Sequence, residues 1–282
     1  MEVLRAPFRL SELGTEYEQA KQKGKMPVEI MGTDGFARYY TMDNLGVNRV
    51  KLIVTYSEDR AKEILDGYSF FDKDILYYPG KDALFYSADI HGHTILRQRM
   101  EVVKSIVEHT ASTIVVSIDG LLNKVVPLEE ITEHMLSFHV GDTLDLNPIK
   151  KYLVSLGYER NDWVDGVGQF AVRGGILDVF PMSSDGPYRI ELWGDEIDSI
   201  RSFDVESQRS IENVDTLSLY PAAEMILDED RIQKGLDRIE REHKSYGKKL
   251  KDDMKTEAYA RINREVNSLK EELDAFHSAM GI

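Results

Sequence analysis

The amino-acid sequence predicts an α/β protein in three parts: a parallel-sheet α/β domain (residues 1–126), an α+β domain with an antiparallel sheet (127–220) and a C-terminal helical segment (221–282). Short apolar runs alternate with helix-like segments in the first part, and strands joined by Gly-containing turns fill the second. In the third, apolar residues recur at spacings of three and four. A chain of 282 residues is long enough for two or three domains with cores of their own.

In the first part, a polar amphipathic helix within residues 1–26 precedes four apolar runs that we interpret as strands: VEIM, KLIVTY, ILYYP and STIVVSI. Helix-like segments separate the runs: residues 35–45, SEDRAKEILDGY with Ser57 as its cap, and a helix that starts near Thr94. Continuous β-branched runs are typical of strands buried on both faces. Their alternation with helices predicts right-handed crossovers and a parallel sheet.

The second part opens with the short helix LEEITEHML and the strand-like LSFHVGDTL, followed by NPIKKYLVSLGY, in which Asn147 can cap and Pro148 takes the first helical position. The pattern then becomes strand and tight turn in QFAVRGGILDVFPM, YRIELWGDEIDSIRSFD and TLSLYP. Gly-Gly and Gly-Asp turns between strands predict antiparallel hairpins, with one or two helices packed against them.

The third part carries an amphipathic stripe on a charged background. The apolar positions are Leu236, Ile239, Tyr246, Leu250, Met254, Ile262, Val266, Leu269, Leu273 and Phe276. One unbroken helix of about 50 residues would be about 75 Å long, which is too long for a single small domain. We therefore expect a break or hairpin near Gly247, or a helix that leans on something outside the chain.

Charge and composition narrow the classes of function. The formal charge of −15 argues against a general phosphate-binding surface, so any DNA contact would have to be local. The absence of Cys excludes disulfides and thiolate metal sites. No 18-residue apolar run or leader sequence appears, and we expect a cytoplasmic protein.

The stretch GTDGFARY at residues 32–39 has the outline of a phosphate-binding loop. A working loop, G-x-x-x-x-G-K-[ST], wraps backbone N–H groups around the phosphates and supplies a Lys and an Mg²⁺-binding hydroxyl. Gly32 fits the first position, but Ala37, Arg38 and Tyr39 occupy the last three. The sequence therefore predicts a degenerate loop, no cofactor and no catalytic residues, with a functional nucleotide site as the alternative.

Other motifs are weaker. GVGQFA at residues 166–171 matches a dinucleotide fingerprint, yet the chain continues as a strand where that motif needs a helix, so we expect a hairpin. His91 and His93 lack a third metal ligand at a recognisable spacing, and we expect no metal site. No nucleophile motif appears.

A group of arginines stands out in the acidic second part: Arg160, Arg173, Arg189, Arg201 and Arg209, with Phe180 and Trp193 nearby. Guanidinium groups and exposed aromatic rings anchor many protein interfaces. The alternative is that these arginines pair with Asp and Glu on the same sheet.

Several blocks point to a family: GYERND, VRGGILDVFP, RIELWGDEIDSIRSFD and SQRSIE, with YYPGKDALFYSADIHGHTILRQRMEVV upstream. Together they closely resemble the module shared by the excision-repair helicase UvrB and the transcription-repair coupling factors (Mfd). UvrB has an intact phosphate-binding loop and a DNA-holding hairpin after its third strand, whereas here the loop is degenerate and only a short segment follows Pro79. These departures favour the coupling factors, and the chain resembles their domains 1a, 2 and the beginning of 1b.

The resemblance implies docking. Family members use the second domain to recruit the damage-recognition ATPase UvrA to stalled RNA polymerase, and Arg160, Arg173 and Arg189 match arginines at that contact, with Phe180 and Trp193 as apolar neighbours. It also implies that the ATP- and Mg²⁺-dependent DNA motor and the RNA-polymerase-binding domain lie outside these residues, and that a C-terminal domain masks the UvrA surface. A UvrB-like ATPase and direct DNA binding by the α/β domain remain the alternatives.

Overall fold

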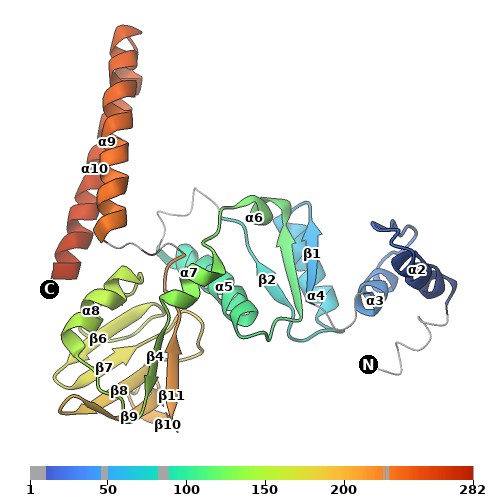
Figure 1. Cartoon of the computed structure of the whole chain (residues 1–282), viewed down its shortest axis with the longest axis horizontal. Coiled ribbons are helices and arrows are strands. Elements are labelled where there is room, and N and C mark those ends of the chain that lie inside the picture. Colours follow the sequence, from blue (N-terminus) through green and yellow to red (C-terminus); the bar gives the residue numbers. More distant parts are fainter. Residues whose placement is uncertain (1–10, 46–49, 82–88, 225, 227–228, 282) are drawn as a thin grey trace. The chain divides into compact units, whose positions relative to one another are not determined.

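The computed structural model describes residues 11–45, 50–81, 89–224, 226 and 229–281 (Figure 1). The chain forms two compact units, Met1–Val125 and Val126–Ile282. The first contains a parallel sheet, and the second contains an antiparallel sheet and the C-terminal helices. The predicted fold class is therefore confirmed.

A three-stranded parallel sheet in the order β1-β3-β2 organises the first unit. Its strands are β1 (Lys51–Thr55), β2 (Leu76–Tyr78) and β3 (Thr113–Ser117), linked through the helices α4 (Glu58–Tyr68) and α5 (Asp89–Val107). The apolar face of α4 packs with Ile53, Tyr77 and Val115, which lie on one face of the sheet. On the other face, α5 places the buried Arg99 guanidinium 4.0 Å from the centre of the Tyr78 ring. Both faces of β3 are buried, as its unbroken apolar run predicted.

Some predicted elements of the first unit are wrong. The run at residues 28–31 forms no strand, and Met31 is 80% exposed, so the run has no sheet neighbour to cover it. The helix α5 begins at Asp89, five residues before the predicted start at Thr94. The structure also describes the helices α2 (Glu12–Gln22), α3 (Phe36–Asn44) and α6 (Ile118–Leu122) in this unit.

A six-stranded sheet in the order β10-β9-β8-β7-β6-β5 dominates the second unit. The strands are β5 (Glu159–Arg160), β6 (Gln169–Arg173), β7 (Ile176–Val179), β8 (Tyr188–Trp193), β9 (Glu196–Phe203) and β10 (Ser210–Val214). All neighbours are antiparallel except β5 and β6, which are parallel. One face holds a buried cross-strand row of Leu177, Ile190 and Ile200. The antiparallel pairing confirms the predicted hairpins.

The same unit contains α7 (Leu128–Glu133), α8 (Leu146–Ser155), which packs against β5 and β6, and a separate antiparallel pair of β4 (Leu136–His139) and β11 (Thr216–Leu219). The cap of α8 is Asp145, whose side chain accepts a hydrogen bond of 2.9 Å from the backbone N–H of Asn147. The prediction that Asn147 caps the helix is therefore wrong by two residues. Pro148 remains tolerated because the first-turn N–H groups need no intrahelical partner.

A tight contact joins the end of α8 to the segment after β11. Gly157 has a φ of 88°, and a Cβ on it would lie 2.5 Å from the Cβ of Ala223, so only glycine fits here. The buried hydroxyl of Tyr158 donates a 2.8 Å hydrogen bond to the carbonyl of Tyr220. This contact fixes the strand β5, which follows directly.

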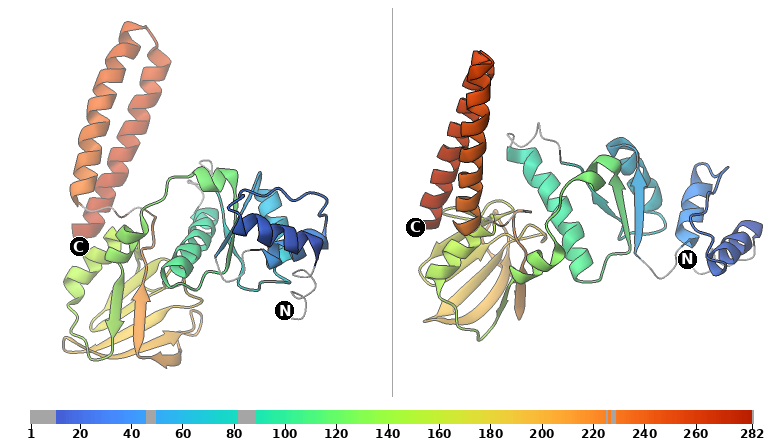
Figure 2. Two further views of the ribbon diagram at one scale, coloured as in Figure 1. Left: turned by 45° about the vertical axis from the view of Figure 1, so that its right-hand side comes forward. Right: turned by 45° about the horizontal axis from the view of Figure 1, so that its top comes forward.

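The C-terminal helices α9 (Glu229–Asp252) and α10 (Thr256–Gly281) form the predicted hairpin, side by side in both views of Figure 2. The chain turns after Asp252 and not at Gly247, because Gly247 lies where the Tyr259 ring of α10 packs closely over α9. Tyr246 and Met254 are 52% and 87% exposed, so these two members of the predicted stripe lie outside the helix–helix contact.

Candidate protein-interaction site

The face of the six-stranded sheet opposite its buried row carries polar residues. Register places two rows across neighbouring strands: Ala171, Asp178, Arg189 and Arg201, and beside them Arg173, Ile176, Glu191 and Ser199. Side chains alternate between the faces of a strand, so both rows lie on one face. We call the polar residues of these two rows the arginine face.

Asp178 is at the centre of the arginine face. Its side chain is 1% exposed, and its two oxygens accept hydrogen bonds from Arg189 Nε at 2.7 Å and Arg189 Nη2 at 2.8 Å. Arg173 Nη2 donates a third bond of 2.5 Å to the same carboxylate. Two guanidinium groups therefore share one buried carboxylate, which satisfies the requirement that a buried charge be paired.

The Arg189 side chain is fixed by contacts with Asp178, Phe203 and Gln208. Its side chain is 16% exposed, its guanidinium lies 4.6 Å from the centre of the Phe203 ring, and it donates to Gln208 Oε1 at 3.3 Å. Hydrogen bonding to Asp178 raises the pKa of Arg189 above its usual value. Arg189 is therefore a charged residue that organises the face from within the structure.

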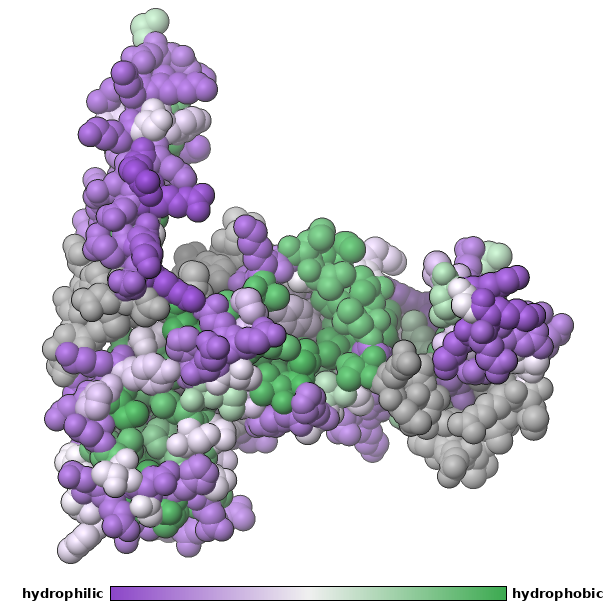
Figure 3. All heavy atoms as spheres, viewed as in Figure 1, coloured by the Kyte–Doolittle hydropathy of each residue, from purple (hydrophilic) through white to green (hydrophobic). Residues whose placement is uncertain are grey.

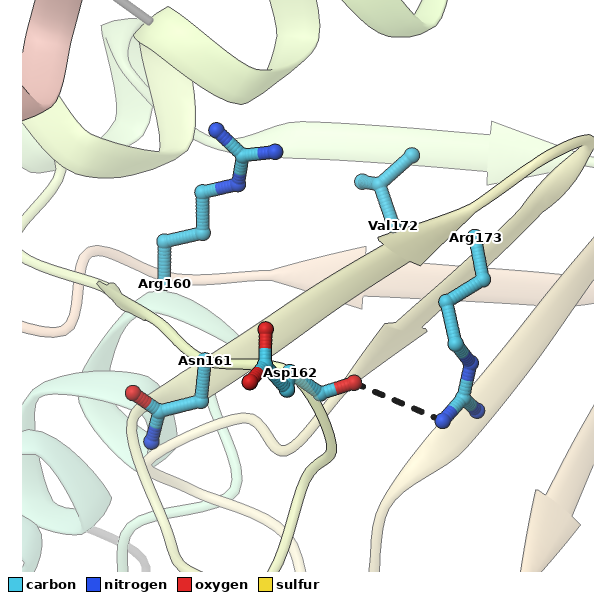
Figure 4. Close-up of a pocket in the computed structure, with 5 residues that line it drawn as sticks. All are labelled: Arg160, Asn161, Asp162, Val172 and Arg173. Atoms are coloured by element: carbon cyan, nitrogen blue, oxygen red, sulfur yellow. Dashed lines mark hydrogen bonds between the residues drawn. The ribbon is translucent and has the colours of Figure 1, made fainter.

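Arg201 pairs with Glu191 on the neighbouring strand. Local pairing, the alternative interpretation of the arginines, thus applies to Arg189 and Arg201. Arg173 differs, because its side chain is 46% exposed. Its Nη1 has only a long 3.5 Å bond to the carbonyl of Asp162 (Figure 4). Arg173 can therefore offer hydrogen-bond donors to a partner while its Nη2 is held by the Asp178 carboxylate.

Arg160 lies on the other side of the sheet. The parallel register pairs it with Phe170, and in Figure 4 its side chain points to the same side as Val172 and away from Arg173. Arg160 is exposed and forms no ion pair with any residue that the structure describes. Arg160, Arg173 and Arg189 therefore do not form one flat cluster: the first two lie around the β5–β6 edge, and the third lies inside the arginine face.

A recess of about 500 Å³ marks this edge, lined by Arg160, Asn161, Asp162, Val172 and Arg173 (Figure 4). Small-molecule sites of this size are mostly apolar, whereas this lining contains a single apolar residue. The recess suits the polar side chains of a protein partner better than a cofactor.

The two apolar neighbours have different positions. Phe180 is 8% exposed and packs in a small core with Val164, Ala171 and Phe203, so it is not available at the surface and its prediction as a contact residue needs correction. Trp193, at the end of β8, is 85% exposed. It lies beyond the register irregularity that follows Glu191, next to the turn between β8 and β9.

Sequence reasoning missed Asp178, the residue that orients two of the predicted arginines. A signal was present: Asp178 stands between Leu177 and Val179 in an otherwise apolar strand, and a carboxylate in such a position needs a cationic partner. The lining residues Asn161 and Asp162 were also missed as site residues, although both belong to the block GYERND that carries the family resemblance.

The loop at residues 32–39 lacks the surroundings of a nucleotide site. No strand precedes it within the described residues 27–35, and Gly32 and Gly35 adopt positive φ values of 78° and 53°. Arg38 pairs with Asp34 at 3.1 Å. The Tyr39 ring packs so closely on α4 that a Cβ on Gly67 would lie 2.4 Å from it. The residues at the positions of the phosphate-binding Lys and hydroxyl thus make contacts within the protein.

Two weaker motifs, at residues 166–171 and at His91 and His93, were also predicted to be structural. The hairpin predicted at residues 166–171 is partly right: Gln169–Ala171 begin β6, which pairs antiparallel with β7, but the turn at 166–168 does not join antiparallel strands, because β5 pairs with β6 in parallel. Within this turn, Gln169 Oε1 accepts from the backbone N–H of Gly166 at 2.9 Å. The side chains of His91 and His93 lie outside those described, and the described ones contain no group of three or more potential metal ligands among His, Cys, Asp and Glu. No helix in the described part of the chain has the length and apolarity needed to cross a bilayer.

Comparison with known proteins places these features in context. Residues 136–225 match the family described as the UvrB interaction domain. The transcription-repair-coupling factor of Bacillus subtilis is 29% identical over 247 residues, which is 86% of this chain and 21% of that protein. Its counterpart in Staphylococcus aureus is 31% identical over 236 residues, 81% of this chain and 19% of that protein. The chain thus spans about a fifth of the length of the relatives it matches.

Proposed function

The chain represents the UvrB-homology region of a transcription-repair-coupling factor, and from this premise we propose that its second unit is a non-catalytic docking module for UvrA. In the whole protein, docking would bring UvrA to RNA polymerase stalled at a lesion. The polymerase-binding domain, and the motor that uses ATP and Mg²⁺ on DNA, belong in this proposal to the remaining four-fifths of the protein. In the same proposal, a C-terminal domain masks the docking surface until the motor acts.

One observation carries the proposal: the residues that match the UvrB interaction domain contain the edge where Arg160 and Arg173 are exposed. Arg173 is the better defined of the two, because Asp178 fixes part of its guanidinium before any partner arrives. A side chain that is already ordered loses less conformational entropy on binding. Charge-assisted hydrogen bonds from such groups contribute about 1.5–3 kcal/mol each.

We assign different roles to the candidate residues. Arg160 and Arg173 contact the partner directly, and Trp193 adds exposed apolar area. Arg189 acts through Asp178 as a positioning residue, since its own donors are used within the chain. Phe180 supports the face from the core.

The test measures binding of the purified 282-residue chain to UvrA by calorimetry, with UvrB as a second analyte. Arg160→Ala and Arg173→Ala should each weaken UvrA binding about 10- to 100-fold, the loss expected for one charge-assisted contact. Arg173→Ala should still fold, because Arg189 retains its two bonds to Asp178.

Arg209→Ala is the matched control. Arg209 is also an exposed arginine, but it precedes β10 at the opposite edge of the sheet, and its removal should leave the affinity unchanged. Equal affinity of the wild type and both edge variants would exclude this surface. Binding to UvrB in place of UvrA would exclude the proposed partner.

A further inference from the structure

The outward side of α9 is basic, although the chain as a whole is strongly acidic. Residues 241–251 contain five Lys and Arg residues and a single Glu, against a formal charge of −15 for the whole chain. In the space-filling view, hydrophilic residues cover the visible face of the α9–α10 hairpin (Figure 3). This basic segment lies on α9 and contains none of the sheet residues that we propose to contact UvrA, so that contact does not account for it.

Helical spacing gathers these cations on one side. Arg238, Arg241, Lys248 and Lys249 are separated by three, seven and one residues, so they share the face that points away from α10. All four are exposed. They lie along about 16 Å of helix. Arg238, Arg241 and Lys249 line an open recess together with Ser245, Tyr246 and one carboxylate, Glu242, so cations outnumber anions there by three to one. We call the surface formed by Arg238, Arg241, Lys248 and Lys249 the α9 basic face.

Among the residues that the structure describes, three of these four cations have no ion-pair partner. Arg238 pairs with Glu242 one turn away, and both side chains are more than two-thirds exposed, so that pair is weak. Within the described residues, the Arg241 side chain donates only to the backbone carbonyl of Asp237. Lys248 and Lys249 form no ion pair with any residue in the described part of the chain. The charge is therefore available to an external anion.

The opposite side of α9, which faces α10, holds the residues that join the two helices. His243 Nε2 lies 2.6 Å from Asn263 Oδ1, and Glu240 pairs with Lys270 at 2.5 Å. Leu250 is 3% exposed. Packing and polar pairing with α10 thus use the residues of one side, and the α9 basic face takes no part in them.

We propose that the α9 basic face binds the phosphate backbone of duplex nucleic acid without reading its sequence. Phosphates of a duplex follow one another at about 1.7 Å along the axis, so about 16 Å of helix can reach several of them. Exposed Lys and Arg without base-reading partners give affinity through counter-ion release. This inference does not depend on UvrA docking, which uses the sheet.

The test is fluorescence anisotropy of a labelled duplex of about 20 base pairs, titrated with the whole chain at about 50 and 200 mM salt. With four cations in contact, the affinity should fall about 150-fold between these salt concentrations. Changing the duplex sequence should leave the affinity unchanged. In Lys248→Glu/Lys249→Glu, the low-salt affinity should drop at least about tenfold and the salt slope should fall by about 1.8, since two contacts are lost.

The control is Arg261→Glu/Arg264→Glu, which changes the net charge by the same amount on exposed positions of α10. It should bind the duplex as the wild type does, and circular dichroism should show that both variants remain helical. The proposal is overturned if the wild type does not bind at low salt, if the α9 variant binds equally well, or if the control loses as much. Binding to anionic vesicles without binding to the duplex would also overturn it.

Discussion

Replacing Asp178 by Asn tests whether one carboxylate holds the arginine face together. The amide keeps the shape of the side chain but removes the charge that Arg189 and Arg173 share. Removing one partner of a buried ion pair costs about 3–5 kcal/mol, because the other charge is left without compensation. The Arg189 side chain is only 16% exposed, so solvent can compensate little of this loss. Arg173 is 46% exposed and should add less than about 1 kcal/mol.

The assay is amide hydrogen exchange followed by mass spectrometry, which reports local opening free energies. Peptides from β7 and β8 should exchange about 10²- to 10⁴-fold faster in Asp178→Asn, the factor that corresponds to about 3–5 kcal/mol. Peptides from β1 and β3 belong to the other unit and should not change, so they are an internal control.

Glu191→Gln supplies the comparison. It removes the partner of Arg201 from the same face, but both side chains are about one-third exposed, and the expected cost is below about 1 kcal/mol. If exchange in β7 and β8 were no faster in Asp178→Asn than in Glu191→Gln, the central role of Asp178 would be refuted.

Three further predictions use the same chain. Gly157→Ala should destabilise the second unit by about 2–4 kcal/mol, because the new Cβ meets Ala223 at 2.5 Å and the backbone has a positive φ; hydrogen exchange of β5 and β6 that matches the wild type would contradict this. Burial raises the pKa of Tyr158, so the stability that its neutral hydroxyl contributes is present below about pH 10 and is lost as the pH rises further. The urea midpoint of the wild type should therefore fall between pH 7 and a pH above 10, and it should fall less in Tyr158→Phe. An equal fall in both proteins would contradict this prediction. Millimolar Mg-ATP should leave thermal unfolding unchanged, whereas binding at a hundredfold excess over Kd would stabilise the chain by about 2.7 kcal/mol.

Periodicity was sufficient to predict most elements of the fold. The apolar run of β3, the Ser57 cap of α4 and the Gly-containing hairpin turns each follow from local rules, and the structure contains all of them. The run at residues 28–31 was wrongly predicted as a strand, because a strand needs a hydrogen-bonded partner strand. A pattern of four apolar residues does not show whether such a partner exists. The predicted helix ends differ from the observed ones by two to five residues. Long-range contacts, such as that of Gly247 with Tyr259, help to decide where a helix stops and are not visible in a local pattern.

The site was harder to predict than the fold. The sequence indicated candidate arginines, but the face on which each one lies depends on strand register, and a shift of one residue moves a side chain to the opposite face. That is why Arg160 and Arg173, both at the β5–β6 edge, point to different sides. The burial of Phe180 likewise depends on residues distant in sequence, such as Val164 and Phe203.

The contact between Tyr39 and Gly67 bears on any attempt to engineer a nucleotide site into this chain. Installing Gly, Lys and Ser at positions 37, 38 and 39 would complete the loop motif on paper, but it would also remove the ring that covers α4 and leave a hole above Gly67. Losing a fully buried aromatic side chain costs about 3–5 kcal/mol, and Tyr39 is partly buried, so the cost here is a fraction of that value. The same three substitutions would supply no strand ahead of the loop. Restoring the motif would therefore weaken the fold before it could create a site, and a redesign would have to rebuild the packing of α3 on α4 first.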